Sequence, residues 1–221
     1  MIAEELINQM IPALKPTDTA EKAIIWMEEL KTNQLPVIDN RNFKGLISED
    51  IILESNDLDR KIGDFKLISE QCYVNDDQHL FDIIRLAQEC DSELVAIIDR
   101  NGEFLGVSRH EDTMKAFSNT LAVQGQGGII VMEMRFIDYS MAEISRLIES
   151  DDAKILGFYL SQDHKDPNFV FLTLKINKVD LTTVIATLER FDYKIVAKFH
   201  ESSNMDTEKE RLDNLLNYLN I

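Results

Sequence analysis

Two stretches decide the fold: Val37-Ile38-Asp39-Asn40-Arg41-Asn42-Phe43-Lys44-Gly45-Leu46-Ile47-Ser48 and, sixty residues later, Ile97-Ile98-Asp99-Arg100-Asn101-Gly102-Glu103-Phe104-Leu105-Gly106-Val107-Ser108. Each has an apolar run ending in Asp, a polar turn, and a second apolar run through a glycine. This pattern predicts a β-hairpin in each stretch. The repeat indicates one small unit duplicated within residues 1–121. Two paired units create a cleft between them, where a small molecule would bind.

The residues around the hairpins complete two copies, at about 6–54 and 62–117. In the first copy, Asp18 and Glu21 suit a capping box that opens a helix before the hairpin. In the second copy, residues 75–78 open the corresponding helix. A short helix follows each hairpin, so the predicted order in each copy is βαββα.

The rest of the chain has a different pattern of apolar and polar residues. Residues 122–128 form a glycine-rich linker, because glycine density breaks regular structure. Residues 129–200 predict the order βαββαβ, the ferredoxin-like arrangement, with Asp180 as a helix cap. Residues 201–221 form a tail whose amphipathic helix carries a leucine stripe: Leu212, Leu215, Leu216 and Leu219. The fold class is therefore α+β.

Composition narrows the choice of partners and compartment. The formal net charge is −17, and residues 1–121 hold 12 Lys and Arg against 24 Asp and Glu. Nucleic acid is a poor partner for such a surface, since contacts from Lys and Arg to phosphate dominate that binding. No apolar run is long enough to span a membrane, and the N-terminus lacks the features of a signal peptide. We expect a cytoplasmic protein in which Cys72 and Cys90 are packed, reduced thiols.

The duplicated part resembles a tandem pair of CBS domains, on Leu35–Asp39 with Gly45–Ser48 and on Val95–Asp99 with Gly106–Ser108. Residues 129–200 look like an ACT domain by element order. The combination is similar to bacterial acetoin-utilisation-type regulatory proteins. The resemblance implies a regulatory protein that binds a small-molecule effector and forms a homodimer.

CBS pairs commonly bind adenosine derivatives, which here implies AMP, ADP, ATP or S-adenosylmethionine, with Mg²⁺ as a possible companion and no required cofactor. In that family a Ser or Thr three residues after the glycine reaches phosphate, and an Asp six residues after it holds the ribose. Ser48 fits the first position in the first copy, where Asp50 stands one residue early. Arg109 and Asp112 occupy the two positions in the second copy. The candidate site also includes apolar strand residues: Leu35, Val37, Ile47, Val95 and Val107.

Alternatives remain open for these residues. Ser48 is equally suited to cap the helix that follows it, and Asp112 to lie in a solvated first turn. The ACT resemblance implies an amino-acid site at the loop with Asp138 and Ser140, although that loop lacks the glycine often found there. A ligand-free interaction module is a further reading. No catalytic or metal-binding constellation is present in the sequence, so we expect a protein that is not an enzyme.

Overall fold

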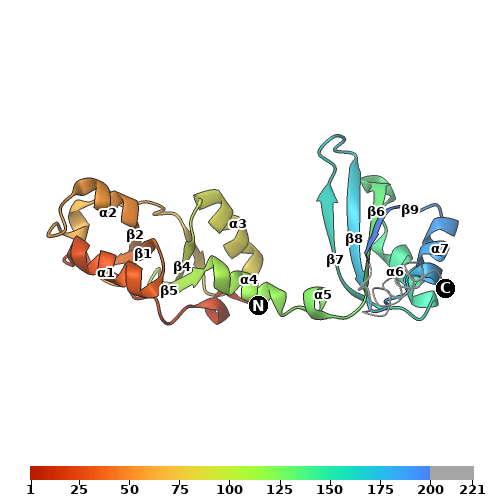
Figure 1. Ribbon diagram of the computed structural model, residues 1–221, viewed down its shortest axis with the longest axis horizontal. Coiled ribbons are helices and arrows are strands. Elements are labelled where there is room, and N and C mark those ends of the chain that lie inside the picture. The colour runs from red at the N-terminus through yellow and green to blue at the C-terminus, as the bar shows by residue number, and fades with distance from the viewer. Residues whose placement is uncertain (200–221) are drawn as a thin grey trace, which may run out of the picture. The chain divides into compact units, whose positions relative to one another are not determined.

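The computed structural model describes residues 1–199 of the chain (Figure 1). Two compact units divide it, Met1–Ser118 (unit 1) and Asn119–Ile221 (unit 2). The division falls just before the predicted end of the duplicated part, and a short helix, α5 (Leu121–Gln124), occupies part of the predicted linker. The predicted tail helix lies outside the described residues. Among the described helices, none is long and apolar enough to cross a membrane.

Unit 1 contains both predicted hairpins, each with a helix before and after it. Its elements are η1 (Ala3–Leu6), α1 (Ala20–Leu30), β1 (Gln34–Asp39), β2 (Asn42–Ser48), α2 (Glu49–Ser55), η2 (Ile62–Asp64), β3 (Tyr73–Asn75), α3 (Leu80–Cys90), β4 (Leu94–Ile98), β5 (Phe104–Arg109) and α4 (His110–Ser118). The second copy shows the full order βαββα. In the first copy the leading strand is reduced to a bridge between Leu14 and Val37.

The helices before the hairpins begin at residues other than the predicted ones. Thr19, and not Asp18, caps α1, because its extended backbone places the hydroxyl oxygen to accept from the Lys22 N–H at 3.4 Å. Asp18 instead accepts from the Lys15 N–H at 2.7 Å. His79 caps α3, its Nδ1 accepting from the Phe81 N–H at 3.3 Å. In both copies the cap is therefore the residue immediately before the helix, Thr19 before α1 and His79 before α3.

The two hairpins share one irregularity. β1 pairs antiparallel with β2, and the register shifts between Val37, which faces Gly45, and Ile38. β4 pairs antiparallel with β5, and the register shifts after Ile97, which faces Gly106. A bulge at the same place in both copies is a conformational signature of the duplication.

A short segment of each copy pairs with the hairpin of the other copy. The N–H of Asn8 donates to the carbonyl of Val107 at 2.8 Å, so the start of the chain pairs with the second hairpin. Ile68, near the start of the second copy, pairs with Leu46 of the first hairpin. We call residues 7–10 and 67–70 the crossing segments. They run beside the two hairpin glycines.

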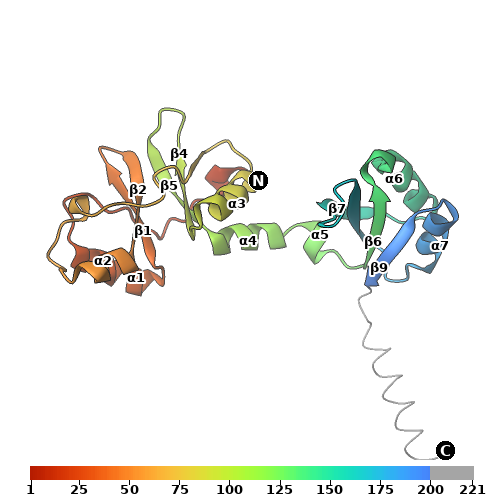
Figure 2. The same cartoon turned by 90° about the horizontal axis from the view of Figure 1, so that it is seen from above.

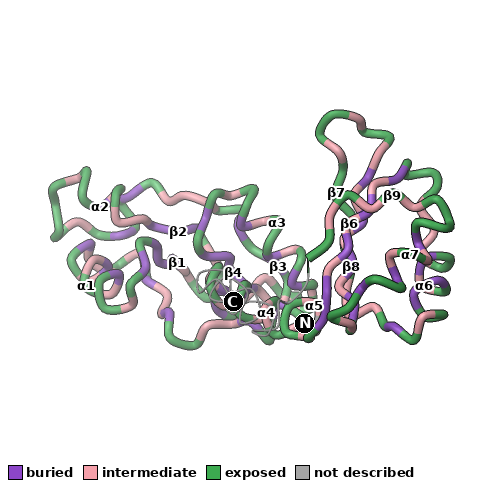
Figure 3. The backbone as a smooth tube through the Cα atoms, turned by 45° about the vertical axis from the view of Figure 1, so that its right-hand side comes forward, coloured by how far each residue is buried: buried purple, intermediate pink, exposed green. Residues whose placement is uncertain are grey.

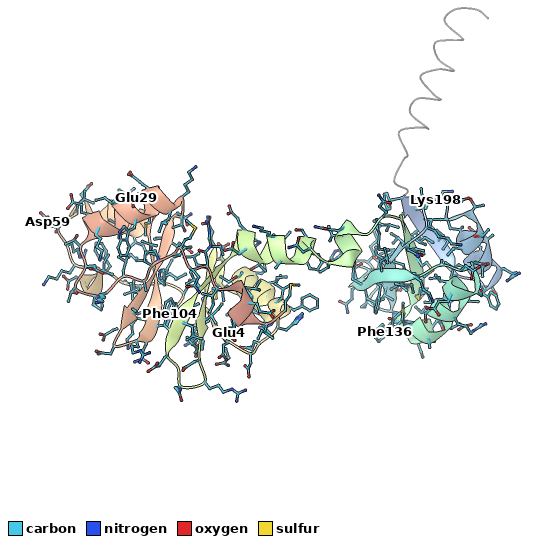
Figure 4. All side chains as sticks on the ribbon, turned by 90° about the horizontal axis from the view of Figure 1, so that it is seen from below. Glu4, Glu29, Asp59, Phe104, Phe136 and Lys198 are labelled. Atoms are coloured by element: carbon cyan, nitrogen blue, oxygen red, sulfur yellow. The ribbon has the colours of Figure 1, made fainter. Side chains whose placement is uncertain are left out.

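Two apolar cores fill unit 1 (Figure 3). The first surrounds Leu14, Met27 and Leu46, and it includes Leu94 and Val107 from the second copy. The second surrounds Val74, Leu80 and Ile97. The copies also touch through Phe43 and Phe104, whose rings stack with centroids 6.2 Å apart. Phe104, on β5, is labelled in Figure 4. The two copies are therefore packed as one body rather than joined by a linker alone.

Unit 2 has the predicted order βαββαβ after α5. Its elements are β6 (Gly128–Arg135), η3 (Phe136–Asp138), α6 (Met141–Ser150), β7 (Ile155–Gln162), β8 (Phe169–Ile176), α7 (Thr182–Arg190) and β9 (Lys194–Phe199). The strands form one antiparallel sheet in the order β7-β8-β6-β9. Both long helices lie on one side of it (Figure 2). Leu181 is the N-cap of α7 and has no side-chain cap bond. The predicted cap, Asp180, stands one residue earlier and accepts from the Thr182 N–H at 2.9 Å.

Candidate functional site

The junction of β5 and α4 presents the guanidinium of Arg109. Arg109 ends β5, and its side chain is 24% exposed. Its Nη2 donates to the carbonyl of Lys31, at the end of α1, at 3.4 Å, and lies 3.4 Å from a carboxylate oxygen of Glu111. Arg109 therefore connects the second copy to the first while part of the guanidinium stays accessible.

Asp112 lies one turn further, in the first turn of α4. Its Oδ2 accepts a 2.7 Å hydrogen bond from Nδ2 of Asn8, on the first crossing segment. Asn8 could not be selected from the sequence, because its partner is 104 positions away in the chain. A carboxylate accepts several hydrogen bonds, so Asn8 orients Asp112 and leaves acceptor capacity for a ligand hydroxyl.

The first copy places different groups at the matching positions. Ser48 caps α2, its hydroxyl accepting from the Ile51 N–H at 3.4 Å. Ile51, the counterpart of Asp112, and Ile68, the counterpart of Asn8, both pack against the first core. Asp50 is exposed beside them. The structure thus places Arg109 and Asp112 at one strand–helix junction of the second copy, each with its own partner, and puts an apolar pair at the matching positions of the first copy.

The apolar candidate residues all lie in the interior. Leu35, Val37, Ile47, Val95 and Val107 have exposed fractions of 1% or less. Their side chains build the cores that hold the hairpins in place. Of these five, Val95 and Val107 belong to the hairpin that ends at Arg109.

A groove of about 330 Å³ adjoins Arg109 through Lys31. Its lining combines one ammonium group with three carboxylates and neutral side chains: Met27, Glu28, Lys31, Thr32, Asn33, Glu49 and Glu93. Nδ2 of Asn33 donates to Glu93 at 3.3 Å, so both copies contribute to the groove. Carboxylates disfavour a bare phosphate here, while a ligand carrying positive charge suits them. Within residues 1–199 no cluster of three His, Cys, Asp or Glu side chains has the geometry to hold a metal ion.

The histidines and cysteines are dispersed in the described part. His79 caps α3, while His110 and His164 are exposed; His200 lies outside the described residues. Cys72 is buried and Cys90 half-buried, and both are free thiols. Burial raises the pKa of the Cys72 thiol, and neighbouring Cys90 raises it further.

Unit 2 has its own pocket, of about 570 Å³, beside the loop predicted to bind an amino acid. Asp138 lines it, and both carboxylate oxygens of Asp138 accept from Arg135, at 2.6 and 3.1 Å. Burial, followed by the charge of Glu143, raises the pKa of Tyr193 in the same pocket. Ser140 caps α6 and accepts from the Glu143 N–H at 3.4 Å. Both candidate residues thus have structural partners, and of the two Asp138 lines the pocket.

No protein-family model matches the chain. Among solved structures, a CBS domain pair/ACT domain protein from Thermotoga maritima is 19% identical, with 53% of this chain and 96% of that chain covered and a TM-score of 0.50. A protein from Methanocaldococcus jannaschii is 17% identical, with 55% and 62% covered and a TM-score of 0.50. CBSX2 in complex with AMP is 22% identical, with 52% and 95% covered and a TM-score of 0.46.

At such identities the likeness establishes architecture. The Thermotoga protein matches 53% of this chain, and unit 1, Met1–Ser118, makes up a similar share of it. The duplicated hairpins, the crossing segments and this likeness agree on one conclusion. Unit 1 has the fold of a tandem CBS domain pair.

Proposed function

We propose that the protein is a non-catalytic regulator whose CBS pair binds an adenosine-type nucleotide at the second copy. The observation that carries the proposal is the placement of Arg109 and Asp112 at one strand–helix junction, with Asn8 holding the carboxylate at 2.7 Å. A guanidinium forms strong charge-assisted bonds to phosphate. A carboxylate accepts from two adjacent ribose hydroxyls. One junction therefore offers both chemistries that a nucleotide needs.

The surrounding charge sets a condition on the ligand. Glu28, Glu49 and Glu93 line the groove next to Arg109, and Lys31 is the cation among its lining residues. Phosphates that extend toward this groove meet like charge, which Mg²⁺ would offset. We therefore propose that di- and triphosphates bind as their Mg²⁺ complexes, while AMP depends less on the metal.

Isothermal titration calorimetry with AMP, ADP, ATP and S-adenosylmethionine, with and without Mg²⁺, tests this function. Arg109→Gln and Asp112→Asn should each weaken binding by about tenfold or more, because each removes a charged hydrogen-bonding group. Arg100→Gln is the matched control, since Arg100 pairs with Asp77 on the exposed hairpin turn. Ser48→Ala in the first copy should also leave affinity unchanged. No heat from any of the ligands at millimolar concentration would refute nucleotide binding.

Pairing of two chains through unit 1 is the proposed route of the signal. α3 and α4 expose four large apolar side chains, which we call the α3/α4 patch: Phe81, Ile84, Met114 and Phe117. Phe81 is 62% and Met114 54% exposed. The counterparts of Phe81 and Phe117 in the first copy are Glu21 and Asn56. The fold of a copy therefore does not require aromatic residues at these two positions. Their exposure in the second copy favours a contact between chains.

Sedimentation velocity over a range of concentrations tests this pairing. Phe81→Glu with Met114→Glu should shift a dimer to a monomer, because the exposed apolar surface gains two charges. Leu53→Glu on the first copy is the control, since Leu53 is similarly exposed on α2. A dimer that survives the double substitution would place the contact elsewhere.

Amino-acid binding by unit 2 is a second candidate, and the pocket beside Asp138 is the observation that favours it. An incoming α-amino group would have to compete with Arg135 for the carboxylate. Calorimetry with the common amino acids, comparing the wild type with Asp138→Asn, separates this function from nucleotide sensing. A ligand-free interaction module would show heat with neither class while retaining the α3/α4 contact.

A further inference from the structure

Strand β7 (Ile155–Gln162) forms one edge of the sheet of unit 2 (Figure 1). Along one side its backbone pairs with β8. In the part of the chain that the structure describes, no backbone group outside β8 bonds to the strand. The N–H and C=O groups on the outer side of β7 therefore have no protein partner there. Such a row of groups is a template for an added strand.

The side chains of β7 are exposed on both faces of the sheet. Phe158 and Leu160 pair with Leu174 and Leu172, which are buried in the core of unit 2. Phe158 is nevertheless 50% exposed and Leu160 37%. Tyr159 points to the opposite face and is 62% exposed. Three successive large side chains are thus open to solvent beside an open backbone edge, and a strand added to β7 would cover both.

The opposite edge of the same sheet is protected in a way that β7 is not. β9 carries Lys194 and Lys198, both exposed, and its pairing with β6 has a register shift. Lysines and bulges on an edge strand oppose pairing with another chain. β7 has no charged residue and no proline, and its register with β8 is unbroken from Phe158 to Gln162. Of the two edges of this sheet, β7 is the one suited to an added strand.

The charge of the chain favours a second copy as the source of that strand. The formal net charge is −17, so two copies that approach each other repel over much of their surface. An uncharged strand lets two copies pair without placing like charges opposite each other. A basic partner, which the acidic surface would attract, gains nothing from a neutral strand. Two β7 strands related by a two-fold axis offer each other the same surface.

One strand pair is too small to hold two chains together. Eight residues extend about 26 Å, and an isolated pair of strands is marginally stable in water. Stable interfaces typically bury about 1,600 Å² in total. A contact between the first units of two chains would raise the local concentration of the second β7 to about the millimolar range. The strand pair would then form within a dimer that is already held through unit 1.

We propose that β7 pairs antiparallel with β7 of a second chain, so that the sheets of the two copies of unit 2 become one continuous sheet. This inference rests on the α3/α4 contact proposed above, which brings the two chains together. It is independent of nucleotide and amino-acid binding. Both units of each chain then take part in the dimer.

Hydrogen exchange of the full chain, measured in a peptide that covers Ile155–Gln162, tests the pairing. In the wild type, exchange in this peptide should slow several-fold between concentrations at which sedimentation finds a monomer and those at which it finds a dimer. Exchange in a peptide that covers β9 should not change. Phe81→Glu with Met114→Glu should keep the chain monomeric and the exchange of β7 fast at every concentration.

A charge on β7 should remove the strand pair and leave the contact through unit 1. Tyr159→Lys should abolish the slowing of β7 exchange and raise the dissociation constant of the dimer about tenfold. Val196→Lys on β9, where Val196 is 42% exposed, is the matched control and should behave as the wild type. Exchange in Phe169–Ile176 should be the same in both variants, which checks that the sheet is intact.

Each other outcome contradicts the proposal. A dimer whose β7 exchange is independent of concentration would overturn the strand pair and leave the α3/α4 contact standing. Slow exchange of β7 in the monomer would mean that another segment of the same chain covers the strand. A chain that stays monomeric at every concentration would remove both contacts.

Discussion

Nδ2 of Asn8 donates to Oδ2 of Asp112 at 2.7 Å, across 104 positions of sequence. The first residues of the chain thereby fix the first turn of α4, and the same crossing segment bonds to Val107 on β5. The candidate site of the second copy is thus completed by a segment from the start of the first copy. Its integrity depends on how the N-terminal residues pack.

Replacing Asn8 by Ala should lower the free energy of unfolding of unit 1 by about 1–2 kcal/mol. The change removes the bond to Asp112 and also the acceptor of the 2.9 Å bond from the Met10 N–H. Asn42→Ala is the control, because Asn42 bonds locally to the carbonyl of Asn40 at an exposed turn. Urea unfolding measures both. Equal losses in the two variants would mean that the crossing bond adds nothing specific.

The two hairpin glycines should differ in their tolerance of alanine. A Cβ on Gly45 would lie 2.8 Å from the Ile68 carbonyl oxygen, and its φ of +137° disfavours any side chain. A Cβ on Gly106 would meet only the Ile7 side chain, at 2.5 Å. We expect Gly45→Ala to cost about 2–4 kcal/mol and Gly106→Ala about half of that. Thermal unfolding decides, and a larger loss for Gly106→Ala would contradict this order.

Burial should protect Cys72 from alkylation. The thiolate is the reactive form, and burial raises the pKa of Cys72, so little thiolate forms at pH 8. Cys90 is half-buried on α3. Mass spectrometry after treatment of the native protein with iodoacetamide should find Cys90 modified before Cys72. Both should react in urea. Faster modification of Cys72 in the native state would show that the second core opens readily.

The sequence reveals more of the scaffold than of the site. Glycines, turn residues and apolar alternation are local signals, so both hairpins and the order βαββαβ of residues 129–200 were predictable. The capping residue is harder to predict, because Asp and Thr are both good N-caps and only backbone geometry selects Thr19 over Asp18. The role of Asn8 could not be predicted from the sequence, since it depends on a crossing segment that pairs with the other copy. The difference between Asp112 and Ile51 could be predicted, because the repeat aligns these two positions.

Asp99 should make the second hairpin sensitive to acid. The Glu103 backbone N–H donates to Asp99 at 2.8 Å and, together with weaker effects of Asn101, lowers the pKa of Asp99 below 3.8, against an opposing effect of burial. A lowered pKa in the folded state gives stability that is present above the unfolded value and is lost as pH falls through the folded value. Asp99→Asn should therefore be less stable than the wild type at pH 7, with the difference shrinking as pH falls below the unfolded pKa and vanishing below the folded pKa. A difference that persists in acid would exclude this cause.

The hydroxyl of Ser92 joins the two copies in their interior. It lies 2.9 Å from both Oε1 of Gln34 and the carbonyl of Leu94, whereas Thr32, its counterpart in the first copy, bonds only locally to the carbonyl of Gln34, at 3.1 Å. Ser92→Ala should cost about 1–3 kcal/mol, because it leaves a buried amide oxygen without that donor. Thr32→Val removes the local bond alone and should cost less. If the two losses were equal in urea unfolding, the local bond would account for both, and the bond from Ser92 to Gln34 would add nothing to the joining of the copies.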